Sequence, residues 1–169
     1  MTEQQYIQIL EQILNEIKDA KLEAKILKSD DGTLLRAIVP LGNSEEEQTA
    51  LADIGIVTTA NGTEIAQIYF TLTAELSDNA EAEIIKALPA LNFYSLIGSY
   101  GIYDHNQVYF KYAIPISEFD DNELRASEIL DAFAVSFESL SGAYDAITAL
   151  ASGTMDYSTA VKSELIPEM

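Results

Sequence analysis

Apart from carboxylates, few side chains in this sequence can take part in acid–base chemistry. The chain has one histidine, His105, and no cysteine. Proton transfer at neutral pH needs a histidine whose surroundings control its protonation. His105 stands between Asp104 and Asn106, in a polar stretch that predicts the tip of a β-hairpin. We therefore interpret it as an exposed turn residue and expect no catalytic residues.

Metal binding and covalent catalysis find little support. A zinc site usually needs histidine and cysteine ligands, which this sequence cannot supply in number. The stretch Ser29–Gly32 resembles the start of a calcium loop, but Leu34, Leu35 and Ala37 stand where oxygen ligands are needed. No GxSxG, Walker A or GxGxxG pattern occurs. We expect no metal, no cofactor and no enzymatic activity.

Tyrosines gather in one region of the sequence. Five of the nine lie between positions 94 and 112, namely Tyr94, Tyr100, Tyr103, Tyr109 and Tyr112. A tyrosine ring offers contact area while its hydroxyl tolerates water, which suits a binding face. Core packing accounts for the same residues, so both interpretations stay open. We name these five tyrosines as candidate interface residues.

The charge balance restricts the partners that the protein can bind. The net charge is −19, and from Ala37 onward 21 acidic residues stand against 4 basic ones. Such a surface repels phosphate backbones and anionic headgroups, so we expect neither nucleic-acid nor membrane binding. It favours cationic partners or basic peptide segments. An acidic surface that only maintains solubility is the alternative.

Length and composition favour one packed domain. The 169 residues are 48% hydrophobic, which is enough for a core. We place the domain at residues 1–153 and expect a C-terminal tail at residues 154–169. The sequence predicts no membrane-spanning helix and no secretory signal. The absence of cysteine fits a cytoplasmic location.

Apolar periodicity predicts three helices, over Thr2–Lys18, Ser77–Leu91 and about Asp121–Ser152. Thr2 is the expected N-cap of the first helix. Pro89 is expected to help end the second helix, because proline disturbs a helix interior. In the third helix, apolar residues step alternately by three and four positions, so one face stays apolar.

Alternating patterns and turn signals predict the strands, over Leu22–Lys28, Thr33–Val39, Leu51–Thr59 and Glu64–Ala74. The stretch Asn92–Ser117 reads as two further long strands, apolar on both faces. We expect this hairpin at the centre of the sheet, with the last helix as its main cover. The predicted fold class is α+β, a twisted antiparallel sheet of about five to six strands. An N-terminal, a middle and a long C-terminal helix flank it.

This order of elements resembles the type III secretion chaperone-like fold. It is similar in particular to YbjN-like proteins, a bacterial family assigned to sensory-transduction regulation. The resemblance covers about Glu3–Gly153 and is carried by the first and last helices together with the segments GTEIAQIYFTL, NAEAEIIKALPALN and SLIGSYGIYDHNQVYFKYAIPI. It implies a curved antiparallel sheet, an acidic cytosolic protein, homodimerisation and binding of proteins or peptides. It supplies no catalytic residues.

Two function classes follow. The leading hypothesis is a non-enzymatic protein-interaction module, chaperone-like or regulatory and dimeric, that binds a protein or peptide partner. The alternative is a small-ligand-binding or enzymatic domain that uses tyrosines and carboxylates in a concave sheet. An immunity-type partner of a basic toxin is a third option. The sequence does not name the partner.

Overall fold

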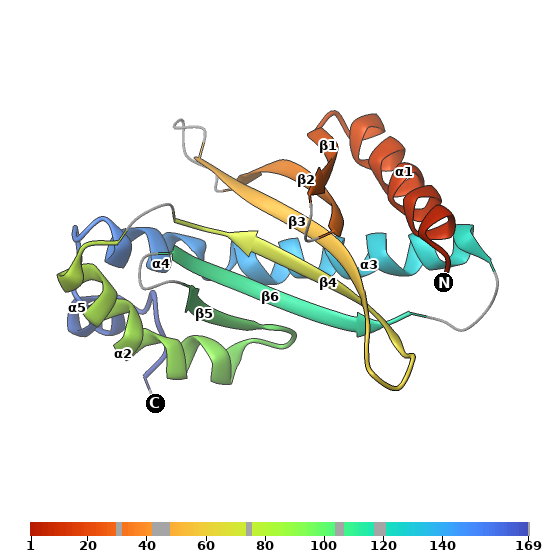
Figure 1. Cartoon of the computed structure of the whole chain (residues 1–169). Helices are drawn as coiled ribbons and strands as arrows, with labels where there is room; N and C mark the ends of the chain where they lie inside the picture. The colour runs from red at the N-terminus through yellow and green to blue at the C-terminus, as the bar shows by residue number, and fades with distance from the viewer. Residues whose placement is uncertain (30–31, 42–47, 74–75, 104–106, 117–120, 169) are drawn as a thin grey trace. The chain divides into compact units, whose positions relative to one another are not determined.

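The computed structural model describes residues 1–29, 32–41, 48–73, 76–103, 107–116 and 121–168. The elements in chain order are α1 (Glu3–Asp19), β1 (Glu23–Ser29), β2 (Gly32–Leu41), β3 (Gln48–Thr58), β4 (Glu64–Thr71), α2 (Asp78–Tyr94), β5 (Ser99–Tyr103), β6 (Gln107–Pro115), α3 (Asn122–Ser141), α4 (Tyr144–Ala151) and α5 (Tyr157–Lys162) (Figure 1). The expected α+β class, with an antiparallel sheet and flanking helices, is confirmed. Asp30, Asp31, Glu45–Glu47 and His105 lie outside the described residues.

The strands form a six-stranded sheet in the order β1-β2-β3-β4-β6-β5. β1 pairs antiparallel with β2, and β5 pairs antiparallel with β6. The hairpin of β5 and β6 therefore lies at one edge of the sheet, and the expectation that it is central is wrong. β5 has only five residues. The predicted long first strand is also wrong, because Asn92–Tyr94 belong to α2.

The chain divides into two compact units. The first comprises Met1–Val39, Leu51–Tyr69 and Tyr112–Val135, and the second comprises Pro40–Ala50, Phe70–Lys111 and Ser136–Met169. Each unit has buried apolar side chains of its own. We describe the two in turn.

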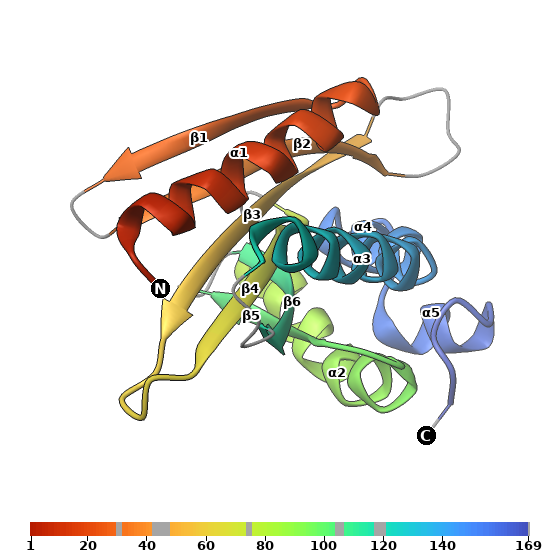
Figure 2. The same ribbon diagram turned by 90° about the vertical axis from the view of Figure 1, so that its right-hand side faces the viewer.

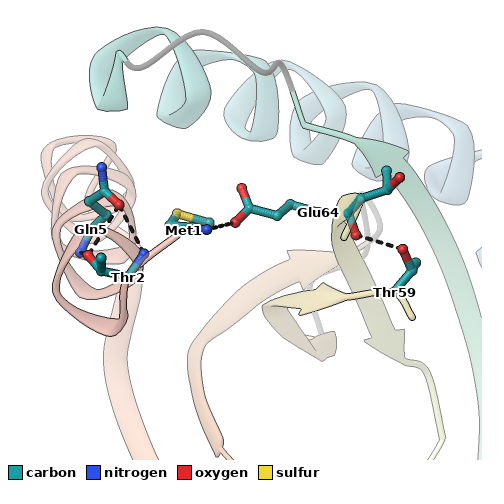
Figure 3. A network of polar contacts seen from close by, with 6 residues as sticks. Met1, Thr2, Gln5, Thr59 and Glu64 are labelled. Atoms are coloured by element: carbon teal, nitrogen blue, oxygen red, sulfur yellow. Dashed lines mark hydrogen bonds and ion pairs between the residues drawn. The ribbon is translucent and has the colours of Figure 1, made fainter. Parts of the chain in front are cut away.

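In the first unit, α1 begins with the expected cap at Thr2. The Thr2 hydroxyl accepts a hydrogen bond from the Gln5 N–H at 3.2 Å, and the Gln5 side chain accepts one from the Thr2 N–H at 2.9 Å (Figure 3). This reciprocal capping box satisfies amide groups that a helix start leaves open. In the same network the Met1 amino group pairs with Glu64, and the Thr59 hydroxyl donates to the Thr63 carbonyl at 3.0 Å.

The core of the first unit follows the predicted periodicities. α1 buries Ile9, Leu10, Ile13 and Ile17. The alternation along β2, β3 and β4 directs every second side chain inward, and those of this unit that are 0% exposed are Leu35, Ala37, Ala52, Ile54, Ala66 and Ile68. Figure 2 shows α1 running alongside β1 and β2. One apolar face of the helix and one apolar face of these strands thus form this core.

In the second unit, aromatic rings and helices fill the core. The Phe110 ring lies 5.0 Å from the Tyr100 ring and 6.4 Å from the Phe70 ring, between centroids. Ile84 on α2 and Leu150 on α4 are also fully buried. The segment expected as a tail holds α5, and its Ala160 and Ile166 are 0% exposed. This part of the chain therefore packs into the second unit.

The predicted last helix is two helices in the structure. α3 ends at Ser141 and α4 begins at Tyr144, so the expectation of one continuous helix is wrong at this point. Gly142 lies in the break and has low helix propensity. The Ala143 N–H bonds to the Leu140 carbonyl at 3.0 Å, a tight closing turn, before α4 begins.

Among the described residues, no helix has both the length and the apolar character needed to cross a membrane. The same part of the chain brings together no group of three histidine, aspartate or glutamate side chains that could hold a metal ion.

Candidate protein-interaction surface

The five tyrosines occupy different environments. Tyr100 is buried, and burial raises the pKa of its phenol to about 12. Tyr109 and Tyr112 are half-buried on β6. Tyr94 at the end of α2 and Tyr103 at the end of β5 are 50% and 68% exposed. Tyr112 belongs to the first unit and the other four to the second. Tyr100 is thus a core residue, while Tyr94 and Tyr103 reach the surface.

Several large exposed apolar side chains of the second unit lie on α2 and directly after it. Ile85, Pro89 and Phe93 follow one another at four-residue steps, which places them on one face of the helix. Ile85 is 53% exposed, Phe93 is 73% exposed, and Pro89 is also exposed. Leu96, two residues after the helix end, is 96% exposed. We call these four residues the α2 stripe.

α2 is therefore apolar on two opposite faces. Its inward face buries Ala80, Ile84, Ala87 and Leu91. Ile84 and Ile85 are neighbours in the sequence, but neighbouring helical residues are about 100° apart, so the two side chains point to different faces. This pair of adjacent isoleucines is the feature of the sequence that indicates a second apolar face on α2. The expectation that Pro89 helps to end this helix is wrong, because α2 continues to Tyr94.

The end of α2 is held by polar contacts to the backbone. The Asn92 side chain accepts from the Tyr100 N–H at 2.6 Å and donates to the Tyr100 carbonyl at 3.0 Å. The Ser95 N–H closes the helix on the Leu91 carbonyl at 3.0 Å. Gly98, with φ of 64°, then turns the chain into β5. These contacts fix the backbone on both sides of Phe93 and Leu96.

Tyr94 extends the apolar surface beside the stripe. Its ring lies 5.0 Å from the Phe93 ring in an edge-to-face arrangement. Its hydroxyl donates to the Glu168 carbonyl at 3.4 Å. Phe93 and Tyr94 thus present two adjoining aromatic rings at the surface, and Tyr94 is a candidate interface tyrosine in direct contact with the stripe.

The charges on α2 are mainly negative. Asp78 and Glu81 lie in its first turn, and Lys86 is the only basic residue of the helix. Lys86 pairs with Glu83, which also accepts a hydrogen bond from the Tyr157 N–H at 2.8 Å. The Lys86 contact, followed by the Tyr157 contact, lowers the pKa of the Glu83 carboxyl. A partner on this helix would meet an apolar stripe beside negative charges.

Comparisons with known proteins give a likeness to a solved structure. Neither protein-family models nor curated proteins match the chain. Among solved structures, the chain is similar to the crystal structure of YbjN from E. coli, described there as a candidate transcription regulator. The TM-score is 0.44 and the identity 15%, over 81% of this chain and 90% of that chain. YbjN is also the protein that gives its name to the family that the sequence resembles.

Proposed function

We propose that this protein is a non-enzymatic protein-interaction module that binds a partner protein through the α2 stripe. The single observation that supports the proposal most strongly is the exposure of Ile85, Phe93 and Leu96 on and beside one helix. We place the module in the cytoplasm, which the lack of cysteine fits.

The spacing of the stripe suits recognition of a helix by a groove. Apolar anchors about one helical turn apart are the pattern by which an amphipathic helix docks into a partner's hydrophobic groove. Full burial of an isoleucine, leucine or phenylalanine side chain contributes roughly 1.5–3 kcal/mol. Three such side chains on and directly after a preformed helix can therefore supply much of the free energy of a specific complex, because little backbone has to be ordered on binding.

The charge of the chain indicates what kind of partner fits. At −19, two copies repel each other, whereas a positively charged protein is attracted and its association is accelerated. Negative charge continues onto α2 itself, at Asp78 and Glu81. We therefore infer a basic partner that offers an apolar groove. Homodimerisation, which the resemblance to YbjN-like proteins implies, is the competing arrangement.

The experiment compares stripe variants with a matched surface variant. Phe93→Asp and Leu96→Asp place a charge in the stripe, whereas Val135→Asp places the same charge on another exposed helical site, where valine is 48% exposed. Each tagged protein is used to capture partners from a native lysate, and captured proteins are then purified and tested individually. We expect a basic protein that binds the wild type and Val135→Asp but neither stripe variant.

Light scattering at micromolar concentration distinguishes a basic partner from a second copy of the chain as the protein that binds the α2 stripe. A monomeric wild type agrees with a basic partner. If the wild type is a dimer that Phe93→Asp dissociates and Val135→Asp does not, the stripe is a self-association surface and the inferred basic partner is wrong. If no purified protein distinguishes the stripe variants from the wild type, and all variants are monomers, the proposed function fails.

A further inference from the structure

The surface hollows of the protein differ sharply in charge. Of five hollows formed by described residues, four are each lined by at least two carboxylates and by no lysine or arginine. The fifth, with a volume of about 580 Å³, is lined by three cations, Lys18, Lys25 and Arg36. We call it the cationic hollow. It stands out in a protein whose net charge is −19.

The hollow lies wholly within the first unit, where β1 forms an edge of the sheet. Lys18 comes from the last turn of α1, Lys25 from β1 and Arg36 from β2. Lys25 is the direct cross-strand neighbour of Arg36. Two like charges directly opposite each other on paired strands are unfavourable. Positive charge is therefore concentrated on neighbouring strands at this edge of the sheet.

Only part of this positive charge is compensated. The Arg36 guanidinium donates from Nε and Nη2 to the two carboxylate oxygens of Asp53, each at 2.7 Å. These hydrogen bonds are the largest of the effects that raise the pKa of the Arg36 guanidinium above its ordinary value. Glu23 lines the hollow and is a second carboxylate near these cations. Among the described residues, neither Lys18 nor Lys25 forms an ion pair. Three cations against two carboxylates leave one net positive charge.

Apolar side chains form the rest of the lining. Leu22, Ile38 and Leu51 line the same hollow as the lysines. Ile38 is 38% exposed and Leu51 is 40% exposed, so both offer apolar surface to a ligand. Ile38 lies on β2 two residues after Arg36, and side chains at that spacing share one face of a strand. Cationic and apolar groups are therefore adjacent.

We propose that the cationic hollow binds a small amphipathic carboxylate. The carboxylate lies on the ammonium groups of Lys18 and Lys25, and the apolar chain of the ligand covers Leu22, Ile38 and Leu51. The volume of about 580 Å³ falls within the range of roughly 300–1,000 Å³ typical of small-molecule sites. This activity is separate from the proposed partner binding, because the α2 stripe belongs to the second unit.

The test titrates the full chain with octanoate and follows amide chemical shifts by NMR at physiological ionic strength. Two matched ligands separate the two parts of the site: octanamide keeps the apolar chain without the charge, and butyrate keeps the charge with a short chain. We expect saturable binding of one octanoate, with shifts at the residues of the hollow. Both matched ligands should bind about tenfold more weakly or worse, because each loses one class of contact.

A pair of variants on one strand tests the location. Lys25→Glu reverses a charge in the hollow, and Lys28→Glu makes the same change three residues along β1, at a residue that does not line it. We expect Lys25→Glu to weaken octanoate about tenfold and Lys28→Glu by no more than about twofold, since exposed charges are screened with distance. Lys25→Arg, which keeps the charge, should retain binding.

Three results would overturn the proposal: absence of saturable octanoate binding, equal binding of octanamide, or equal loss in Lys25→Glu and Lys28→Glu. Thermal unfolding of each variant confirms that the fold is intact before binding is compared. The octanoate titration needs no protein partner. A negative result there does not contradict the proposed function of the α2 stripe, and a negative result for the α2 stripe does not contradict binding in the cationic hollow.

Discussion

The Asn92 side chain bonds both backbone groups of Tyr100, accepting from its N–H at 2.6 Å and donating to its carbonyl at 3.0 Å. This double contact ties the last turn of α2 to the edge strand β5. Phe93, next to Asn92, is thereby held in place although its own side chain is 73% exposed. The exposed part of the stripe thus stands on an ordered backbone.

Loss of this contact should destabilise the protein measurably. Asn92→Ala removes two hydrogen bonds, so we expect the free energy of unfolding to fall by about 2 kcal/mol in urea denaturation. Asn92→Asp keeps the acceptor for the Tyr100 N–H but places a carboxylate oxygen against the Tyr100 carbonyl oxygen, so it should also be less stable than the wild type. Equal stability of Asn92→Ala and the wild type would show that the contact contributes nothing.

Gly98 should tolerate no side chain. Its φ is 64°, and a Cβ atom there would meet the Phe110 ring and lie 2.6 Å from the Lys111 carbonyl oxygen. Gly98→Ala should therefore cost roughly 2–5 kcal/mol from strain and overpacking together. Gly62, with φ of 87° and open space around it, is the control. Gly62→Ala should cost only the conformational strain, roughly 1–2 kcal/mol, and a similar loss in both variants would contradict the packing argument.

Tyr100 should make stability depend on pH in the alkaline range. Burial raises the pKa of its phenol to about 12 in the folded protein, against about 10 in the unfolded chain. The stability from the neutral phenol is thus fully present below pH of about 10 and is lost as pH rises through about 12. Relative to the wild type, Tyr100→Phe should gain about 1 kcal/mol between about pH 8 and pH 11 in urea unfolding. Parallel pH profiles for the two proteins would contradict the shift.

Tyr6 should contribute to the first unit through its hydroxyl. That group donates to the Thr33 carbonyl and accepts from the Ile56 N–H at 3.3 Å. Tyr6→Phe leaves both backbone groups without this partner, so we expect a loss of about 1–2 kcal/mol. In Tyr94→Phe the deleted hydroxyl is exposed and bonds at 3.4 Å, so the loss should stay below about 0.5 kcal/mol. Urea denaturation of the two variants makes the comparison, and equal losses would contradict it.

Local signals predicted much of the fold. The cap at Thr2 and the stripe of α1 depend on neighbouring residues, and the structure has both. The alternation along β4, with Ala66, Ile68 and Phe70 buried, was also readable from period-two spacing. In these elements the local pattern and the packing select the same face.

Elements whose apolar residues do not all face the core were harder to predict. Phe93, Tyr94 and Leu96 look like strand residues in the sequence, yet Phe93 and Tyr94 end a helix and all three are exposed. Aromatic and apolar residues favour a buried strand only when another part of the structure packs on them. The sequence does not say whether that packing comes from the same chain. The cationic hollow was missed because Lys18, Lys25 and Arg36 come together only after β1 pairs with β2 and α1 packs against β1.

The most direct test of the central claim is the affinity of a purified basic partner for three forms of the protein: wild type, Phe93→Asp and Val135→Asp. We expect Phe93→Asp to weaken binding by about 2 kcal/mol or more, roughly thirtyfold, and Val135→Asp to leave it within about twofold. Higher salt should slow association with the wild type, because opposite charges steer the encounter. Equal affinity of Phe93→Asp and the wild type would contradict the proposed role of the α2 stripe.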